Sequence, residues 1–255
     1  MNKQAEDLAR ENARLRGDLL TVATRISHDL RTPLAGILNT AELLKEIFKE
    51  NEIPAEFESI FTSVDEMMQL IKSVSLMAKA SANPPPPQKM KMSDAVYRAW
   101  QRLERKISKS AAHVDIADSW PEIFGVADWL DFIWTQLLSN ALKYGGKEIE
   151  MGWHEENGVG KFFVRDSGKE IPPAARAKLF QPFEELHRPS GARGLGLAMS
   201  RRLIELQNGK CGYEFDGGSV FYFRLSLAEI NDGCAQARVC EDIGPTVINY
   251  EAAAR

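Results

Sequence analysis

Apolar residues recur at alternating spacings of four and three along the start of the chain. The repeat is formed by Leu8, Asn12, Leu15, Leu19, Val22 and Ile26, with charged residues between its members. This heptad pattern predicts a coiled-coil helix whose seam faces a second helix. The polar seam residue Asn12 favours a parallel dimer in one register. An ordinary amphipathic helix is the alternative, because three heptads do not exclude it.

The helical pattern continues beyond this repeat and then starts again. It runs through Pro33, where we expect a kink because proline removes an amide donor. Asn51 to Pro54 breaks it, and a second apolar stripe follows from Phe57 to Val74. Two amphipathic helices joined by a short break predict an antiparallel helical hairpin. One hairpin buries two stripes poorly, so we expect two hairpins to form a dimeric four-helix bundle.

A proline-rich segment separates this helical half from a half of mixed pattern. Residues 83–92 include consecutive prolines at 84–87, which favour a stiff, extended hinge between two domains. Beyond the hinge, Ser93 is predicted to cap a helix that runs through Leu103. Further helices are predicted over 126–144 and 197–207, and strands over 113–116, 149–153, 161–165, 211–215 and 220–227, with turns at Asn157-Gly158 and Gly217-Gly218. This mixture predicts an α/β sandwich over residues 93–228.

Composition places the chain among ordinary globular proteins. Its 255 residues are 44% hydrophobic and 27% charged, and the net charge of −4 argues against a surface that binds nucleic acid. Three cysteines are too few for a disulfide scaffold, and no apolar run is long enough to cross a bilayer. We therefore expect a cytoplasmic chain without direct membrane contact. Residues 229–255 show no clear period, and we assign them to a tail of unknown role.

A histidine follows the predicted seam in a position that suits chemistry. His28 lies two residues after Ile26, so its ring is expected to face water. A neutral imidazole is a nucleophile near pH 7, and the neighbouring Asp29 can orient the ring and accept a proton. A solvated surface histidine is the alternative, and this pattern by itself does not separate the two.

The helix predicted over 126–144 carries a polar face. Its members are Gln136, Asn140, Lys143 and Tyr144, which are three or four residues apart. Amide oxygens can ligate Mg²⁺, and a lysine can contact phosphate. A helix with an exposed polar face and no ligand is the alternative.

Two glycine-containing loops carry further polar chemistry. Asp166 ends a predicted strand and is followed by Gly168. A carboxylate in that position can bind the exocyclic amine of adenine, and the glycine permits a close approach. Residues 191–198 contain three glycines at the start of a predicted helix, where backbone amides can face phosphate oxygens. A simple turn and a mobile connection are the alternatives.

Taken together and in order, these motifs resemble those of the bacterial sensor histidine kinases of two-component systems, over residues 1–228. The matching motifs are the phospho-acceptor box at 28–34, the N box at 136–144, the first glycine box at 166–168, the phenylalanine box at 179–183 and the second glycine box at 194–197. Motifs in this order and at this spacing argue against a chance match.

The resemblance implies a fold and an activity. Residues 1–82 would form a coiled-coil entry and a dimerisation and phospho-acceptor hairpin, residues 83–92 a hinge, and residues 93–228 a Bergerat-type ATP-binding sandwich. The implied enzyme is an ATP-dependent protein histidine kinase that uses Mg²⁺, forms a homodimer and acts on the receiver domain of a response regulator. The chain would be the cytoplasmic part of a longer sensor or would receive its signal from a partner, with the coil at 5–26 as the input.

The resemblance also implies roles for individual residues. His28 would attack the γ-phosphate of ATP with Asp29 as base, and the phosphoryl group would pass to an aspartate of the regulator. Thr32 matches the position that places water for removal of phosphate from the regulator. Asn140 would hold Mg²⁺, and Asp166 would bind the adenine amine. The implied ATP-binding set is Gln136, Asn140, Lys143, Tyr144, Asp166, Gly168, Arg188, Arg193, Gly194, Leu195, Gly196 and Leu197.

The chain departs from the family pattern in and near three of these motifs. Glu170 stands where the first glycine box commonly has its second glycine, and Ala192 stands at the start of the second box. Residues 184–185 are acidic where the family often has a basic residue, and Arg188 and Arg193 are the candidates to replace it. Two alternatives therefore stay open: a weakly catalytic scaffold, which these departures favour, and an enzyme that acts mainly as a phosphatase of its regulator.

Overall fold

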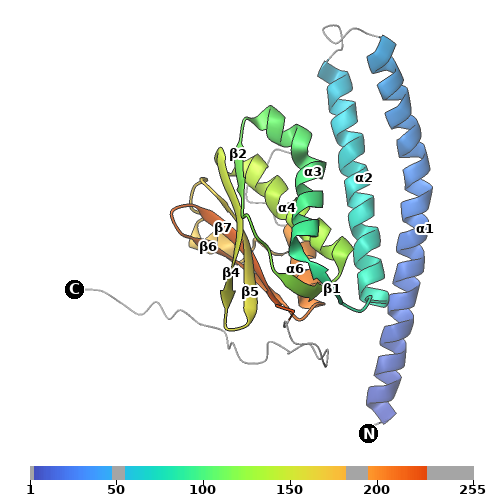
Figure 1. Ribbon diagram of the computed structural model, residues 1–255. Coiled ribbons are helices and arrows are strands. Elements are labelled where there is room, and N and C mark those ends of the chain that lie inside the picture. Colours follow the sequence, from blue (N-terminus) through green and yellow to red (C-terminus); the bar gives the residue numbers. More distant parts are fainter. Residues whose placement is uncertain (1–2, 48–54, 182–194, 229–255) are drawn as a thin grey trace. The chain divides into compact units, whose positions relative to one another are not determined.

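The structure is a computed structural model that describes residues 3–47, 55–181 and 195–228 (Figure 1). The chain divides into two compact units. One combines Met1–Pro86 with Glu170–Leu206, and the other combines Pro87–Lys169 with Gln207–Arg255. None of the described helices is long and apolar enough to cross a membrane. The predicted tail at 229–255 lies outside the described residues.

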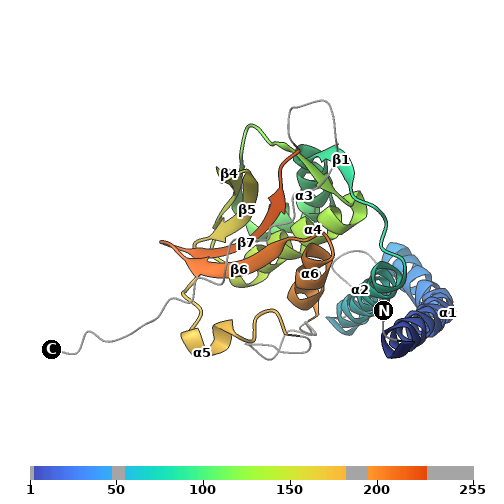
Figure 2. The ribbon, with the colours of Figure 1, turned by 90° about the horizontal axis from the view of Figure 1, so that it is seen from below.

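Two long helices form the N-terminal part of the first unit. α1 spans Lys3–Ile47 and α2 spans Ala55–Ala82. They lie side by side, and Figure 2 shows them nearly end-on. The core between them consists of Leu34, Val64 and Ile71, with Leu38, Met67 and Met68 packed against it. The predicted pair of helices is confirmed, and α1 runs through Pro33 as one helix.

α1 buries one side and exposes another. Ala23 and Ser27 are buried and lie one helical turn apart. Leu15, Val22 and Ile26 of the predicted seam are 55%, 54% and 52% exposed. The described part of the seam is therefore not covered by α2, and it remains a large apolar surface in the single chain.

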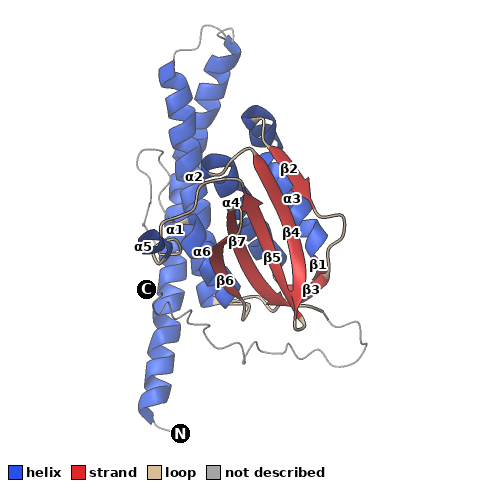
Figure 3. Ribbon diagram, turned by 90° about the vertical axis from the view of Figure 1, so that its left-hand side faces the viewer, coloured by secondary structure: helices blue, strands red, loops and turns tan. Residues whose placement is uncertain are grey.

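A five-stranded sheet forms the centre of the second unit, with the strand order β2-β4-β5-β7-β6 (Figure 3). The strands are β2 (His113–Ile116), β4 (Glu148–Glu156), β5 (Val159–Asp166), β6 (Lys210–Phe215) and β7 (Ser219–Ser226). β2 pairs with β4 in parallel, and the other neighbours are antiparallel. One face is covered by α3 (Met92–Ser110) and α4 (Ala127–Tyr144). The predicted α/β sandwich is confirmed.

Aromatic packing joins α4 to the sheet. Trp134, Phe162 and Phe223 are fully buried. The Trp134 ring meets the Phe223 ring edge-on at 5.3 Å between centroids, and the Phe162 ring stacks on Phe223 at 5.3 Å. Such large apolar side chains dominate the stability of a core. They hold α4 against the sheet, whose strand β5 ends at the buried Asp166.

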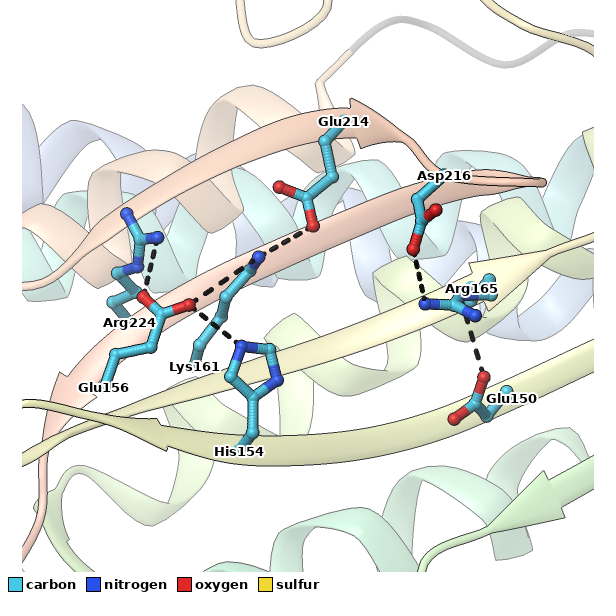
Figure 4. A network of polar contacts seen from close by, with 8 residues as sticks. All are labelled: Glu150, His154, Glu156, Lys161, Arg165, Glu214, Asp216 and Arg224. Atoms are coloured by element: carbon cyan, nitrogen blue, oxygen red, sulfur yellow. Dashed lines mark hydrogen bonds and ion pairs between the residues drawn. The ribbon is translucent and has the colours of Figure 1, made fainter. Parts of the chain in front are cut away.

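The other face of the sheet carries a network of paired charges (Figure 4). The Lys161 side chain is buried, and its Nζ donates to Oε1 of Glu214 at 2.7 Å. Arg165 of β5 pairs with Glu150 of β4 and with Asp216, which follows β6. Successive side chains of a strand point to opposite faces, so β5 alternates these charges with its core residues. For the buried Lys161, this pairing offsets the cost of taking its charge out of water.

A second, two-stranded sheet has no counterpart among the predicted elements. β1 (Gln88–Lys91) pairs antiparallel with β3 (Glu122–Gly125). β1 lies inside the segment predicted as a hinge, at 83–92. The extended prolines at 84–87 precede it.

The prediction that Ser93 caps the helix after the hinge is wrong. α3 begins at Met92, and the residue before it, Lys91, makes no side-chain capping hydrogen bond. The amide of Met92 donates instead to the carbonyl of Pro121 at 3.0 Å. A contact between distant parts of the chain therefore takes up the first amide of the helix, and a local cap is not needed there.

Both predicted hairpins are confirmed. Asn157 and Gly158 join β4 to β5 with φ angles of 53° and 79°, as a type I′ turn requires. β6 and β7 are joined around Gly217, whose φ is 64°. Two further helices belong to the first unit, α5 (Pro173–Arg176) and α6 (Gly196–Glu205). α6 corresponds to the helix predicted over 197–207.

Candidate active site

His28 projects from α1 into solvent. Its side chain is 79% exposed, whereas the preceding residue, Ser27, is only 4% exposed. The Nδ1 atom of His28 lies 3.2 Å from Oδ1 of Asp29. A carboxylate only accepts hydrogen bonds, so Nδ1 carries the proton in this contact and the lone pair is left on Nε2. Thr32 is also exposed and lies one helical turn further along α1.

Arg25 is a member of this group that the sequence motifs did not indicate. Its Nε donates to Oδ2 of Asp29 at 3.2 Å, so the two carboxylate oxygens have different partners. The hydrogen bonds from His28 and from Arg25 hold the pKa of Asp29 below its usual range. Four residues separate Arg25 from Asp29, and that spacing on a helix is the signal that would have found the pair.

The predicted polar face of α4 is present in the second unit. Gln136 and Asn140 are half-buried, and Lys143 and Tyr144 are exposed. The helix ends at Tyr144, where the amide of Gly145 donates to the carbonyl of Ala141 at 2.9 Å. The half-buried amides can therefore reach a ligand while the rest of the helix is held by the core.

Asp166 is a buried carboxyl group at the end of β5. It is 4% exposed, and its Oδ1 accepts a hydrogen bond from the amide of Gly168 at 2.8 Å. Burial raises the pKa of Asp166, and the hydrogen bond from Gly168 opposes part of that rise. A carboxyl group held in this way is a fixed acceptor rather than a mobile surface charge.

Glycines allow the backbone to close around this carboxyl group. A Cβ on Gly168 would lie 2.5 Å from Oδ1 of Asp166, and a Cβ on Gly145 would lie 2.6 Å from Cγ of the same residue. A side chain at either position would therefore collide with the carboxyl group. The structure thus brings the end of α4 together with Asp166 and Gly168. Gly145 had not been predicted as part of the site.

The departure at Glu170 has a structural partner. Glu170 forms an ion pair with Arg176 of α5, and Nε of Arg176 donates to the carbonyl of Ile171 at 2.9 Å. On the other side of the loop, Ser219 donates to the carbonyl of Lys169 at 3.1 Å. At a position where the family pattern has a flexible glycine, the ion pair with Arg176 therefore restrains the loop.

The second glycine box lies at the start of α6. Leu195 precedes the helix without a side-chain cap, and Gly196 and Leu197 begin it. The first amides of a helix have no intrahelical partner, so this end suits an anion. Of the predicted ligands, Arg188, Arg193 and Gly194 lie outside the described residues, as do residues 182–183 of the phenylalanine box and Ala192.

Comparison with known proteins identifies both parts of the chain. Residues 18–83 match the His Kinase A (phospho-acceptor) domain, and residues 125–229 match the family of histidine kinase-, DNA gyrase B- and HSP90-like ATPases. The chain belongs to the two-component sensor histidine kinases. The first match contains His28, Asp29 and Thr32, and the second contains Asn140 and Asp166.

Curated histidine kinases are similar over most of this chain. The methanogenesis regulatory histidine kinase FilI of Methanothrix harundinacea is 30% identical over 200 residues, which are 76% of this chain and 23% of the relative. The sensor histidine kinase AruS of Pseudomonas aeruginosa is 28% identical over 246 residues, 89% of this chain and 24% of the relative. The chain spans about a quarter of the length of these relatives.

Solved histidine kinase structures share the fold. Full-length ShkA, in complex with AMPPNP, aligns with a TM-score of 0.64 and 24% sequence identity, over 82% of this chain and 46% of that chain. At this identity the likeness concerns the fold of the histidine kinase, and the roles of single residues depend on the geometry described above.

Proposed function

We propose that this chain is the core of an ATP-dependent protein histidine kinase that phosphorylates itself on His28. The observation that carries the proposal is the exposed imidazole whose Nδ1 is held by Asp29. This arrangement leaves Nε2 as a solvent-facing nucleophile. The domain family of residues 18–83 is named for a phospho-acceptor histidine, and it supports the same reading.

The second unit would bind the nucleotide. Asp166 is a buried acceptor suited to the exocyclic amine of adenine, and the close approach at Gly145 and Gly168 fits a planar ring against backbone. Within this unit, Lys143 would meet the phosphates. The AMPPNP complex of the similar ShkA supports ATP as the substrate class.

A magnesium ion fits the donors of this chain. Asn140 is half-buried and offers a neutral amide oxygen, a ligand that Mg²⁺ accepts beside phosphate oxygens and water. When bound, the ion would neutralise charge on the transferring phosphoryl group. Asn140 would hold it, with Gln136 one turn earlier on the same face.

The transfer would follow from these placements. The Nε2 lone pair of His28 forms a bond to the γ-phosphorus while the bond from that phosphorus to the β-bridging oxygen breaks, and ADP leaves with the electron pair. The Nδ1 proton passes through Asp29 to water, which keeps the phosphoimidazole neutral at the ring. The phosphoryl group then moves to an aspartate of a response regulator. Within the segment 83–92, the prolines at 84–87 that precede β1 would supply the hinge for this cycle.

The assembly would be a homodimer. Leu15, Val22 and Ile26 form an exposed apolar stripe with heptad spacing, and a second copy of α1 would cover it. Together with the hairpin of residues 1–82, such a dimer would form the four-helix bundle that the sequence predicts. We place the protein in the cytoplasm, where ATP and a response regulator are at hand.

Radiolabelled ATP tests the activity. The wild-type chain is expected to take up label that is stable in alkali and labile in acid, and His28→Ala is expected to lose it. An unlabelled wild type that still binds ATP would favour the scaffold alternative instead. Label retained in His28→Ala would overturn the assignment of the acceptor.

A phosphatase activity toward the regulator is a second candidate function. Thr32 is exposed one helical turn after His28, where it can hold a water molecule beside a phosphorylated aspartate. Thr32→Ala is expected to slow dephosphorylation of the regulator while leaving labelling of His28 unchanged. Equal rates for Thr32→Ala and wild type on a phosphorylated regulator would exclude this role.

A further inference from the structure

We propose that Arg25 is a positioning residue of the phospho-acceptor site: it clamps the Asp29 carboxylate so that His28 presents Nε2 for attack. The inference rests on the proposed histidine kinase activity and adds to it a residue outside the matching motifs. It concerns only side chains of α1, which all lie on one described helix.

Geometry is the first argument. Arg25, His28 and Asp29 occupy positions that share one face of a helix. Oδ1 of Asp29 accepts a hydrogen bond from Nδ1 of His28 at 3.2 Å. Oδ2 accepts one from Nε of Arg25, also at 3.2 Å. A carboxylate with one partner can rotate about its terminal bond, whereas one with a different partner on each oxygen has its plane fixed. The plane of Asp29 in turn fixes the edge of the imidazole that it faces.

Helix stability does not account for the pair. The side chains of Arg25 and Asp29 are 81% and 57% exposed, and exposed ion pairs add little to stability. The base also precedes the acid, which is the less favourable order along a helix because of the helix dipole. A role in orienting the neighbouring nucleophile explains why the guanidinium lies on this carboxylate.

Tautomer control is the consequence for His28. While Asp29 is ionised it can only accept, so the ring must place its proton on Nδ1 and keep Nε2 free. Asp29 is ionised near neutral pH, its pKa being lowered first by the hydrogen bond from His28 and then by that from Arg25. The contribution of Arg25 is therefore to hold the carboxylate in position. On the neighbouring helix α2, Lys72 and Lys79 form no ion pair with Asp29 among the described residues. The clamp is therefore local to α1.

The test compares Arg25→Gln and Arg25→Lys with a matched control in the full chain. Arg14→Gln is the control, because Arg14 is another exposed arginine of α1 that pairs with an acid, Glu11, away from His28. The first readout is nitrogen-15 NMR of the histidine rings at a pH where they are neutral, with His28→Ala used to assign the His28 signals. The second is the initial rate of His28 labelling as a function of pH.

Arg25→Gln is expected to raise the fraction of His28 rings protonated on Nε2. It is also expected to lower the labelling rate by about 3- to 10-fold, a small part of what a directly acting acid–base group contributes. The lower rate is expected across the pH range measured, because Arg25 acts on the orientation of the Asp29 carboxylate. Arg25→Lys should restore most of the rate, and Arg14→Gln should match wild type.

Two results would overturn the inference. One is an unchanged tautomer ratio and labelling rate in Arg25→Gln, and the other is an equal loss in Arg14→Gln, which would indicate a general effect on the helix. Failure of the kinase assignment looks different, since then wild type takes no label or His28→Ala keeps it. If wild type is labelled and Arg25→Gln behaves like wild type, the proposed role of Arg25 is refuted, whereas the kinase assignment stands.

Discussion

Two carboxyl groups of this histidine kinase lie in opposite environments, one exposed and one buried, and their pKa values move in opposite directions. Asp29 lies on the open surface of α1, and hydrogen bonds from His28 and Arg25 lower its pKa. Asp166 lies at the end of β5, 4% exposed, and burial raises its pKa. The helical part keeps its carboxylate exposed and charged beside His28, while the sheet part keeps its carboxyl group out of water. Under the proposed function, the same type of side chain would serve phosphoryl transfer in one unit and recognition of adenine in the other.

Removing the charge at Asp29 should give the largest effect. Asp29→Asn is expected to lower the rate of His28 labelling by about 100-fold, because an amide cannot take the Nδ1 proton and does not fix the tautomer. ATP binding, measured by calorimetry, should match wild type. Loss of ATP binding in Asp29→Asn would show that the two carboxyl groups are not divided between the two tasks.

The matching change at Asp166 should act on binding instead. Asp166→Asn is expected to weaken ATP binding by about 10- to 100-fold. A hydrogen bond to a charged group contributes about 1.5–3 kcal/mol, which corresponds to a change of that size in affinity. Calorimetry with ATP and with GTP provides the measurement, since a lost adenine contact should reduce the preference between them. Unaltered affinity and preference would remove Asp166 from the adenine site.

Filling the space beside Asp166 should affect both binding and folding. Gly168→Ala places a Cβ 2.5 Å from Oδ1 of Asp166, so the loop must move, at a cost of about 1–3 kcal/mol. Gly17→Ala is the control for an open glycine site, because nothing lies within 4 Å of a Cβ there and alanine favours the helix; circular dichroism follows this variant in the helical unit. Urea unfolding followed by tryptophan fluorescence reports on the sheet unit, which holds all five tryptophans. Equal stability of Gly168→Ala and wild type would contradict the close packing.

The smallest effects should appear in the pH dependence of stability, with opposite signs. A raised folded pKa at Asp166 means that its contribution to stability is present below its ordinary value and is lost as pH rises through the folded value. Asp166→Asn should therefore gain stability relative to wild type across that window. A lowered pKa at Asp29 contributes stability above its ordinary value that is lost as pH falls, so Asp29→Asn should lose stability relative to wild type as pH rises.

Urea unfolding from about pH 3 to pH 7 measures both differences. Tryptophan fluorescence follows the unit of Asp166, and circular dichroism follows the helical unit of Asp29. The magnitude at Asp29 should be slight because that carboxylate is exposed to solvent. If the stability of both variants relative to wild type changed in the same direction as pH rises, the two carboxyl groups would not have oppositely shifted pKa values.

The sequence predicted the long elements well because each repeats one simple pattern. The stripes of α1 and α2, and the turn at Asn157-Gly158, follow directly from spacing and turn chemistry. β1 and β3 were missed because four-residue strands give no periodic signal. The cap at Ser93 was predicted wrongly because the amide of Met92 is satisfied by a residue far along the chain.

The sequence motifs indicated the motif residues of the candidate site, but they did not indicate the neighbouring residues that hold them in place. Exposure of His28 followed from its place beside the seam, and the motif around Asp166 indicated a carboxyl group at a strand end. Arg25 and Gly145 carry no motif of their own. Arg25 contributes through its contact with Asp29, and Gly145 contributes through its close approach to Asp166. The second contact joins residues far apart in the sequence, so it can be seen only in the folded chain.

One further consequence lies in the neighbours Ser27 and His28. Adjacent residues of a helix are about 100° apart around its axis, and here that angle separates a side chain that is 4% exposed from one that is 79% exposed. A rolling motion of α1 by one such step would hide the imidazole and bring the serine outward. Because α1 is one helix from Lys3 to Ile47, rotation about its own axis is a motion that would change the exposure of His28 along with the rest of the helix.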